Sequence, residues 1–257
     1  MARIVSIHSF RGGTGKSNTT ANLTALLAQA GYRVGVIDTD IQSPGIHVLF
    51  GLDEEKMDRS LNDYLWGKCA IEDAAYDVSP LVRMGKGAAA VMGGGIHLIP
   101  SSIKAGEIAR VLQEGYDVNL LSDGFRELTK RLKLDYLLID THPGLNEETL
   151  LSIALSDELI IILRPDQQDY QGTAVTVDVA RKLDVPRMML VVNKVLSSFD
   201  FDAVKTRVEQ SYDVPVAGVL PLTEEMVALG SSDLFALRYP DHPLTQRLRA
   251  IVEQVMA

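Results

Sequence analysis

Short apolar runs alternate with longer amphipathic stretches along most of the chain. The runs have the length of buried strands, and the stretches have the period of about 3.6 residues that is typical of helices covering a sheet. This alternation predicts an α/β fold with a mostly parallel, twisted sheet and helices on both faces. Strands are expected at 3–9, 33–38, 96–100, 135–140, 158–164, 187–193 and 215–220. Helices are expected at 16–30, 104–114, 119–133, 147–155, 171–183, 201–211 and 243–256.

The segment 53–95 does not follow this alternation, and its glycine-rich part, 85–95, is typical of a loop. The rest of the sequence shows no long linker that would separate two domains. A chain of 257 residues, 46% of them hydrophobic, can bury one substantial core. We therefore expect a single domain over 1–257, with an insertion around 53–95.

The first predicted strand runs into the sequence Phe-Arg-Gly-Gly-Thr-Gly-Lys-Ser at 10–17, which precedes the first predicted helix. Three glycines let successive N–H groups face one centre, and the helix N-terminus adds the positive end of its dipole. Such a loop binds phosphates, with Lys16 on the outer phosphates and the Ser17 hydroxyl on Mg²⁺. The pattern predicts a nucleoside triphosphate site. The residues expected to bind the nucleotide here are Gly12, Gly13, Thr14, Gly15, Lys16, Ser17 and Asn18.

This loop departs from the common GxxxxGK(S/T) pattern, because Phe10 replaces the first glycine and Arg11 precedes the paired glycines. A basic residue at that place resembles the deviant Walker A motif of the ParA/MinD family of P-loop ATPases, of SIMIBI type, which is usually KGGxGK(S/T). The resemblance implies a molecular switch that binds ATP and Mg²⁺, dimerises with ATP, hydrolyses it slowly and positions a cellular cargo. In that family a signature lysine reaches the phosphates of the partner subunit, which makes Arg11 a candidate catalytic residue beside Lys16. Arginine keeps the charge, but its planar fork does not replace an ammonium group freely.

Two further predicted strands end in acidic residues, and ligands of open α/β sheets bind at the carboxyl ends of strands. The first acids, Asp38 and Asp40, match a DxD of the family. The resemblance implies that Asp38 belongs to the magnesium shell and that Asp40 is catalytic, orienting the attacking water. Alternatively, Asp40 caps a helix that begins near 43–44. The second acid, Asp140, resembles a Walker B aspartate that holds the metal through water, and Gly144 after it should face the γ-phosphate.

Softer signals follow the later strands. In the family an asparagine and a proline-containing loop enclose the adenine, which implies nucleotide contacts for Asn193 and Pro221. A lone asparagine after a strand is also a common turn former. The counterpart of 164–169 lies by the dimer interface of the family. His142 could sense phosphate or pH, although the family accepts varied residues at its place.

The last predicted helix has an apolar stripe, for which two interpretations compete. The stripe can pack in the core, or it can bind a membrane as the C-terminal helix of MinD does, with Arg247 and Arg249 facing anionic lipid. The core interpretation is favoured because the stripe matches the last helix of the family fold. The stripe consists of Leu244, Leu248, Ile251, Val252 and Val255.

Composition bears on several functions, and it leaves nonspecific DNA binding through a local basic patch possible although not favoured. A net charge of −9 weighs against nonspecific DNA binding, which depends on neutralising phosphates with Lys and Arg. The single cysteine, Cys69, excludes a disulfide framework and the paired cysteines with which iron–sulfur carriers of related fold bridge their subunits. The chain begins with a predicted strand instead of a signal peptide and has no apolar run of membrane-spanning length, so a cytoplasmic location is expected.

A different class of function stays open at this point. An ATP-dependent metabolic enzyme of the amidotransferase or ligase type can use the same scaffold. It would need a second pocket for a carbon substrate beside the γ-phosphate, and the sequence shows no acid–base cluster that announces one. The ParA/MinD resemblance implies other partners, namely a second copy of the chain and a protein activator or cargo adaptor.

Overall fold

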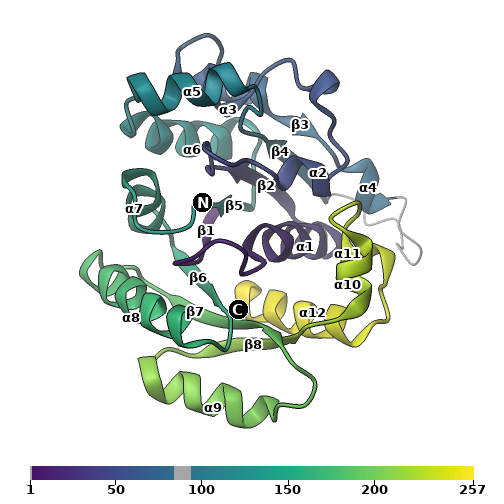
Figure 1. Ribbon diagram of the computed structural model, residues 1–257. Helices are drawn as coiled ribbons and strands as arrows, with labels where there is room; N and C mark the ends of the chain where they lie inside the picture. The colour runs from purple at the N-terminus through teal and green to yellow at the C-terminus, as the bar shows by residue number, and fades with distance from the viewer. Residues whose placement is uncertain (1, 84–93) are drawn as a thin grey trace.

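One sheet crosses the middle of the computed structural model, which describes residues 2–83 and 94–257 (Figure 1). Within these residues the strand order is β3-β4-β2-β5-β1-β6-β7-β8, and all neighbouring strands are parallel except β3 and β4. The expected mostly parallel sheet is confirmed. The strands are β1 (Arg3–His8), β2 (Arg33–Asp38), β3 (Tyr76–Asp77), β4 (Gly95–Ile99), β5 (Tyr136–Asp140), β6 (Glu158–Leu163), β7 (Met188–Val195) and β8 (Val216–Pro221).

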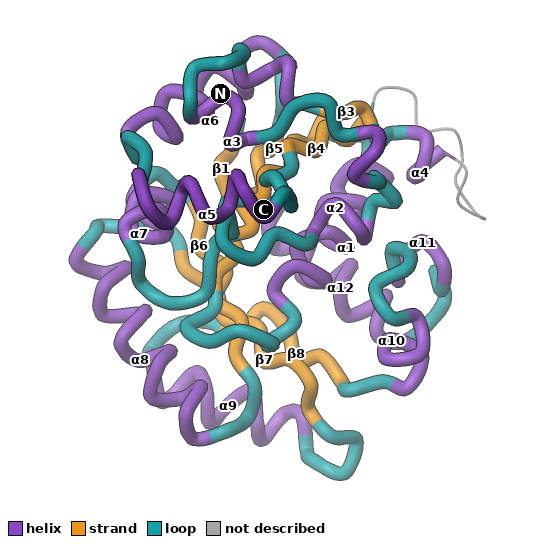
Figure 2. The backbone as a smooth tube through the Cα atoms, turned by 45° about the horizontal axis from the view of Figure 1, so that its top comes forward, coloured by secondary structure: helices purple, strands orange, loops and turns teal. Residues whose placement is uncertain are grey.

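Helices cover both faces of this sheet, as Figure 2 shows in a second orientation. On one face α1 (Lys16–Gln29), α2 (Ile46–Leu49), α11 (Phe235–Arg238) and α12 (Pro243–Met256) contribute to one hydrophobic cluster. The opposite face carries two clusters, built with the help of α3 (Leu61–Leu65), α5 (Ala105–Glu114), α6 (Asn119–Arg131), α7 (Glu147–Ala154), α8 (Gln167–Lys182) and α9 (Phe201–Tyr212).

The side chains of β5 show why both faces of the sheet must be covered by helices. Tyr136 and Leu138 pack into the α1 cluster, whereas Leu137 and Ile139 pack into the cluster that contains α6. All four are buried, so an apolar run of strand length serves two cores through the alternation of a strand.

The central strand β1 marks the point where the chain changes direction across the sheet. It pairs with β5 on one side and with β6 on the other. In open α/β sheets a crevice forms at the carboxyl ends of the strands at such a point. The loop after His8 therefore opens into the expected ligand site.

The segment 53–95 contains short elements that the sequence pattern did not reveal. They are the 3₁₀ turns η1 (Glu54–Lys56) and η2 (Ile71–Ala74), the helices α3 and α4 (Pro80–Arg83), and β3, which pairs antiparallel with β4. Most of the glycine-rich part expected to be a loop lies outside the described residues, and Gly95 already begins β4. That 53–95 is an insertion into one domain stays a prediction.

Helix α8 begins four residues earlier than expected. The carboxylate of Asp166 accepts hydrogen bonds from the N–H groups of Gln168 (3.1 Å) and Asp169 (3.0 Å), so it caps the helix. Outside 53–95, three short helices are absent from the expected set, namely α2, α10 (Glu224–Leu229) and α11. A helix close to α2 is expected only in the alternative interpretation of Asp40. All three are too short to show a helical period in the sequence.

The C-terminal helix α12 uses its apolar stripe inside the fold. Leu244, Leu248, Ile251, Val252 and Val255 are all buried, in the same cluster as residues of α1. The core interpretation of this stripe therefore agrees with the structure. Among the helices in the described ranges, none is long and apolar enough to cross a membrane.

Candidate nucleotide-binding site

Glycines in the left-handed region shape the loop between β1 and α1. Gly13 has a φ of 76° and Gly15 a φ of 93°, which residues with a Cβ rarely adopt. A Cβ on Gly15 would also collide with the amide nitrogen of Asn193, at the end of β7. That nitrogen donates to the carbonyl of Thr14 (2.8 Å), and Nζ of Lys194 donates to the carbonyl of Gly13 (2.8 Å). Two side chains of β7 therefore hold the carbonyl groups of the loop.

The N–H groups of the loop, in contrast, are available. Within 2–83 and 94–257, the backbone N–H groups of 12–18 donate to no carbonyl and no side chain. A row of free donors at the N-terminus of a helix suits an anion with several oxygens, such as a polyphosphate. The hollow at this loop measures ≈ 260 Å³ and is lined by Ser9, Gly12, Gly13, Thr14, Gly15, Lys16, Ser17, Asn18, Asp40, Ser43 and Pro143.

The ammonium of Lys16 is paired inside the site. Its Nζ lies 2.8 Å from Oδ1 of Asp140, the last residue of β5, and the hydroxyl of Thr20 donates to the same oxygen (3.1 Å). The side chains of Lys16 and Asp140 are only 7% and 1% exposed, so solvent screens this pair little. A phosphate that enters the loop therefore competes with Asp140 for the lysine.

Asp38, at the end of β2, lies beside Asp140 in the register of the sheet. Burial, and then the charge of Asp140, raises the pKa of Asp38 to about 8. Its carboxylate accepts hydrogen bonds from the N–H groups of Asp40 (3.0 Å) and Gly45 (3.1 Å). The two buried carboxyl groups lie side by side, and a hard divalent cation such as Mg²⁺ would displace the proton of Asp38 and bind its carboxylate. The residues present thus fit the expected magnesium role of Asp38 and Asp140.

No group of three or more His, Cys, Asp and Glu side chains that could hold a metal ion occurs in the described part of the chain. A cation in this site would therefore complete its shell with hydroxyl, phosphate and water oxygens, as Mg²⁺ commonly does. Ser17 lines the same hollow and supplies such a hydroxyl.

Asp40 lines the hollow and stabilises the turn that follows it. Its Oδ1 accepts from the N–H (3.1 Å) and the hydroxyl (3.0 Å) of Ser43, and Nε2 of His142 lies 3.8 Å from this oxygen. The helix α2 begins only at Ile46, whose N–H donates to Asp38 (3.4 Å). The interpretation that Asp40 caps a helix here is wrong, because the N–H groups of Gly45 and Ile46, where α2 starts, donate to Asp38 instead. The catalytic role of Asp40 stays a prediction.

The segment after β5 contacts the phosphate loop. Gly144 has a φ of 86°, and its N–H donates to the carbonyl of Ser9 (3.2 Å). Oγ1 of Thr141 lies 2.8 Å from Nδ1 of His8, whose ring is completely buried. Burial, and then the charge of Lys16, lowers the pKa of His8 to about 3, so the ring is neutral. That Gly144 faces a γ-phosphate stays a prediction.

A second hollow adjoins the loop between α1, α12 and the region of α10. Its walls are largely apolar, with a few amide, hydroxyl and ammonium groups, which suits a planar base. Asn193 and Pro221, the two residues expected at the adenine, both line it. The full lining is Gly15, Asn18, Thr19, Asn22, Asn193, Lys194, Leu220, Pro221, Leu222, Thr223, Met226, Leu244 and Leu248.

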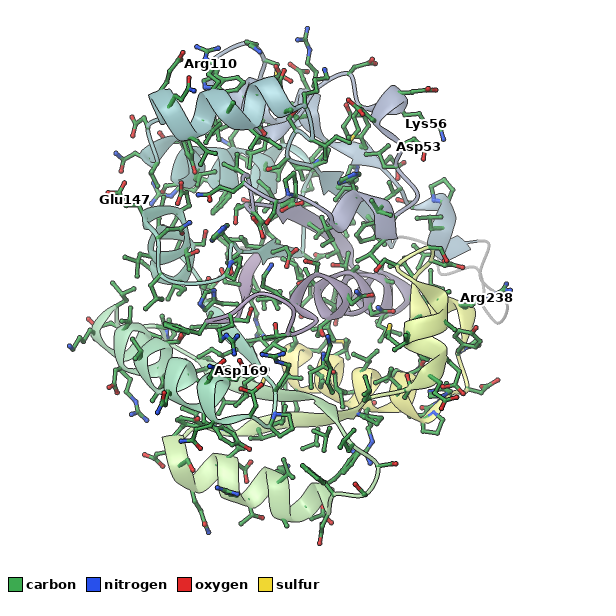
Figure 3. The ribbon with its side chains drawn as sticks, in the orientation of Figure 1. Asp53, Lys56, Arg110, Glu147, Asp169 and Arg238 are labelled. Carbon is green, nitrogen blue, oxygen red and sulfur yellow. The ribbon has the colours of Figure 1, made fainter. Side chains whose placement is uncertain are left out.

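Arg11 turns toward helix α8 of its own chain. Its Nη1 donates to Oε1 of Gln168 and lies 3.7 Å from Oδ1 of Asp169. Asp169, which is labelled in Figure 3, belongs to the first turn of α8. Asp169 is buried and also accepts two hydrogen bonds from Arg164 (3.0 and 3.1 Å). Arg11 thus lies beside a carboxylate, that of Asp169, which Arg164 already binds more closely. The side chain of Arg11 is 41% exposed.

Phe10 packs against the same helix. Its ring lies so close to Gly172 of α8 that a Cβ at this position would collide with it. The residue that replaces the first loop glycine therefore fixes α8 beside the phosphate loop.

Comparisons with known proteins agree with this geometry. A family model described as an AAA domain matches residues 2–186, more than half of the chain. The crystal structure of the cell division ATPase MinD of Pyrococcus furiosus superposes with a TM-score of 0.81 over 100% of this chain and 99% of that one, at 22% identity. The chain belongs to the ParA/MinD family of P-loop ATPases.

Two other similar proteins have names or bound ligands that point to a nucleotide. An uncharacterised ATP-binding protein of Methanocaldococcus jannaschii is 28% identical over 100% of this chain and 88% of its own length. The septum site-determining protein MinD of Pyrococcus horikoshii, solved with Mg-ADP, has a TM-score of 0.78 and 24% identity, and the match covers 99% of this chain and 96% of that one. At this identity the two solved structures establish the ParA/MinD fold alone.

The structure brings nearly all the expected ParA/MinD site residues to one edge of the sheet. The loop 12–18 and Asp40 line the phosphate hollow, and Asn193 and Pro221 line the neighbouring one. Asp38 and Asp140 lie beside each other in the sheet, and Asp140 pairs with Lys16 of the loop. The sequence interpretation missed Lys194 and Thr20. The first follows Asn193 directly and could have been noticed, whereas the contact of Thr20 with Asp140 joins positions 120 residues apart.

Proposed function

We propose that this protein is an ATP-dependent switch that binds ATP and Mg²⁺, forms a homodimer in the ATP-bound state, hydrolyses ATP slowly and positions a cellular cargo in the cytoplasm. The observation that carries the proposal is the pairing of Lys16 with Asp140 directly below a loop of free N–H donors. The ammonium of Lys16 can exchange the carboxylate of Asp140 for a phosphate, and Asp140 and the neighbouring Asp38 can then bind a metal ion. MinD of other organisms, named for septum site determination, supports a positioning role.

Each residue has a defined task in this proposal. The N–H groups of 12–18 bind phosphate oxygens, and Lys16 exchanges Asp140 for the outer phosphates. Mg²⁺, when bound by Ser17 and the acids Asp38 and Asp140, supplies charge neutralisation for the phosphates. Asp40 orients the attacking water in the same hollow.

Dimerisation is proposed to depend on Arg11. The guanidinium of Arg11 lies 3.7 Å from the carboxylate of Asp169, which already accepts two hydrogen bonds from Arg164. The side chain can therefore leave α8 and grip a phosphate of the partner subunit with two parallel hydrogen bonds. A solved complex of MinC with MinD from Aquifex aeolicus supports the further proposal of a protein partner that reads the dimer.

Three variants test the proposal. Lys16→Ala should abolish tight ATP binding, measured by isothermal titration calorimetry with Mg-ATP. Asp40→Ala should bind ATP, turn it over far more slowly and remain dimeric in sizing chromatography. An ATP-loaded Asp40→Ala protein that elutes as a monomer would contradict the switch.

Arg11→Ala separates binding from dimerisation. It should bind ATP but lose the ATP-dependent dimer, whereas unchanged dimerisation would refute a role of Arg11 across the interface. Arg110→Ala is a matched control, because Arg110 is 45% exposed, lies on α5 and pairs with Glu114. Turnover measured with DNA, liposomes or candidate amino and carboxylic acid substrates then separates a positioning ATPase from a metabolic enzyme.

A further inference from the structure

A second large groove lies at the opposite edge of the sheet from the nucleotide hollow. It measures ≈ 780 Å³ and opens where α6, the end of α7 and the starts of β1 and β5 meet, near the N label in Figure 1. Ligand clefts commonly have volumes of about 300–1,000 Å³. The groove therefore has the size of a binding site, although no residue of the phosphate hollow lines it.

The floor of this groove is apolar. Ile4, Phe125, Leu134 and Leu155 line it, and Phe125 and Leu134 belong to the buried core cluster of this face. An apolar floor of this kind can accept the side chain of a leucine or phenylalanine from outside, because burying such a side chain is favourable.

One wall of the groove carries cations without partners. Arg126, Lys130 and Lys133 line it and are exposed, and no ion pair joins any of them to another of the described residues. Free cations gathered on one wall are notable in a chain with a net charge of −9. In a chain that is acidic overall, the cations on this wall would attract an acidic partner to the groove.

The two acids of the groove are partly engaged with the backbone. One carboxylate oxygen of Asp135 accepts from the N–H of Arg33 (2.8 Å), and one of Asp157 accepts from the N–H of Ile4 (2.8 Å). These bonds hold the two aspartates at the strand edge. The basic wall is formed by the separate segment from α6 to Lys133.

The spacing of the cations indicates what kind of anion fits. Arg126 and Lys130 are one helical turn apart on α6, about 6 Å along its axis, and Lys133 follows just beyond the end of the helix. Such a row does not converge on one point, as a site for a single carboxylate or phosphate would. It matches a chain segment with several acidic side chains in a row.

We propose that this groove docks an acidic segment of a partner protein, with an apolar side chain on the Phe125 floor and carboxylates along Arg126, Lys130 and Lys133. The proposal stands independently of the nucleotide site. The groove is also well placed to influence that site, because α7 runs from the loop after Gly144 to Leu155 at the groove.

A peptide array tests the proposal with the full-length protein. One set holds twelve-residue peptides with one or two leucines or phenylalanines among glutamates and aspartates, and a second set replaces every acid with glutamine. We expect members of the acidic set to bind and their glutamine counterparts to bind at least tenfold more weakly. Absence of binding to the acidic set, or equal binding to both sets, would overturn the proposal.

Variants then place the binding in the groove. The double variant Lys130→Glu with Lys133→Glu should bind the best acidic peptide at least tenfold more weakly, measured by fluorescence anisotropy. The double variant Lys182→Glu with Lys205→Glu changes the charge equally on exposed parts of α8 and α9 and should bind as the wild type does. Equal losses in both variants would show unspecific attraction and refute the site.

A further variant tests the floor without changing the charge. Ser122→Trp should fill the groove from α6 and also weaken peptide binding at least tenfold, while the circular dichroism spectrum and ATP binding stay at wild-type values. Unchanged peptide binding in Ser122→Trp would contradict the proposed position. If dodecanoate bound with the same dependence on Lys130 and Lys133 while no peptide did, the groove would be a small-molecule site and the proposal wrong.

Discussion

The buried pair of Lys16 and Asp140 predicts a measurable stability defect in the nucleotide-free protein when the lysine is removed. In Lys16→Ala, Asp140 keeps its hydrogen bond from Thr20, loses the ammonium that pairs with it, and remains beside the buried Asp38. Removing one partner of a buried ion pair typically costs about 3–5 kcal/mol. The variant should therefore be much less stable as well as deficient in ATP binding.

We expect Lys16→Ala to lose about 3–5 kcal/mol of unfolding free energy, because it leaves the buried carboxylate of Asp140 without its ammonium partner.

Urea unfolding of the nucleotide-free protein, followed by circular dichroism, measures these values. The set contains wild type, Lys16→Ala, Asp140→Asn and the double variant. The double variant should be more stable than Lys16→Ala, because it no longer buries an unpaired charge. Lys194→Ala is a matched control that removes an exposed lysine of β7, which donates to the carbonyl of Gly13, and it should cost about 1 kcal/mol. A Lys16→Ala protein within 1 kcal/mol of the wild type, or a double variant no more stable than it, would refute the reasoning.

Three further predictions concern other parts of the chain. Gly15→Ala should lower the unfolding free energy by about 2 kcal/mol and weaken ATP binding, because position 15 has a φ of 93° and a Cβ there would collide with Asn193. Gly106→Ala should have neither effect, because a Cβ at position 106 would stand in open space. The pKa of the buried Glu158 is raised from 4.5 by burial, so folding loses stability as pH rises above 4.5; Glu158→Gln should remove this loss in thermal melts between pH 4 and 8. Asn146→Ala should lower the unfolding free energy by about 1 kcal/mol in urea, because Asn146 caps α7 through the N–H of Thr149 (2.9 Å); no change would contradict the cap.

The main strands and helices follow from the sequence because each is long enough to show its period. The run at 135–140, for example, has four largely apolar residues between two aspartates, and its residues 136–140 become β5, which is buried on both sides. Short elements such as α2 and β3 could not be predicted this way, since four or two residues contain no period. Their positions depend on tertiary contacts. At the start of α2, for example, the carboxylate of Asp38 accepts hydrogen bonds from the N–H groups of Gly45 and Ile46.

The candidate site was predictable to the extent that its residues follow strands. Lys16 and the two aspartates could be placed at one edge because parallel strands bring their carboxyl ends together. What the sequence could not show is how these groups are paired. The partner of Lys16 is 124 positions away, and the cis contact of Arg11 depends on where α8 begins, four residues before the expected start.

The contact between Phe10 and Gly172 makes two distant positions interdependent in evolution. A chain with phenylalanine at the first place must keep glycine at the second, whereas a chain with a small residue at the first place is free to enlarge the second. Among relatives, the residues at these two positions should therefore covary. For the protein engineer, restoring a glycine at position 10 calls for a compensating larger residue at position 172.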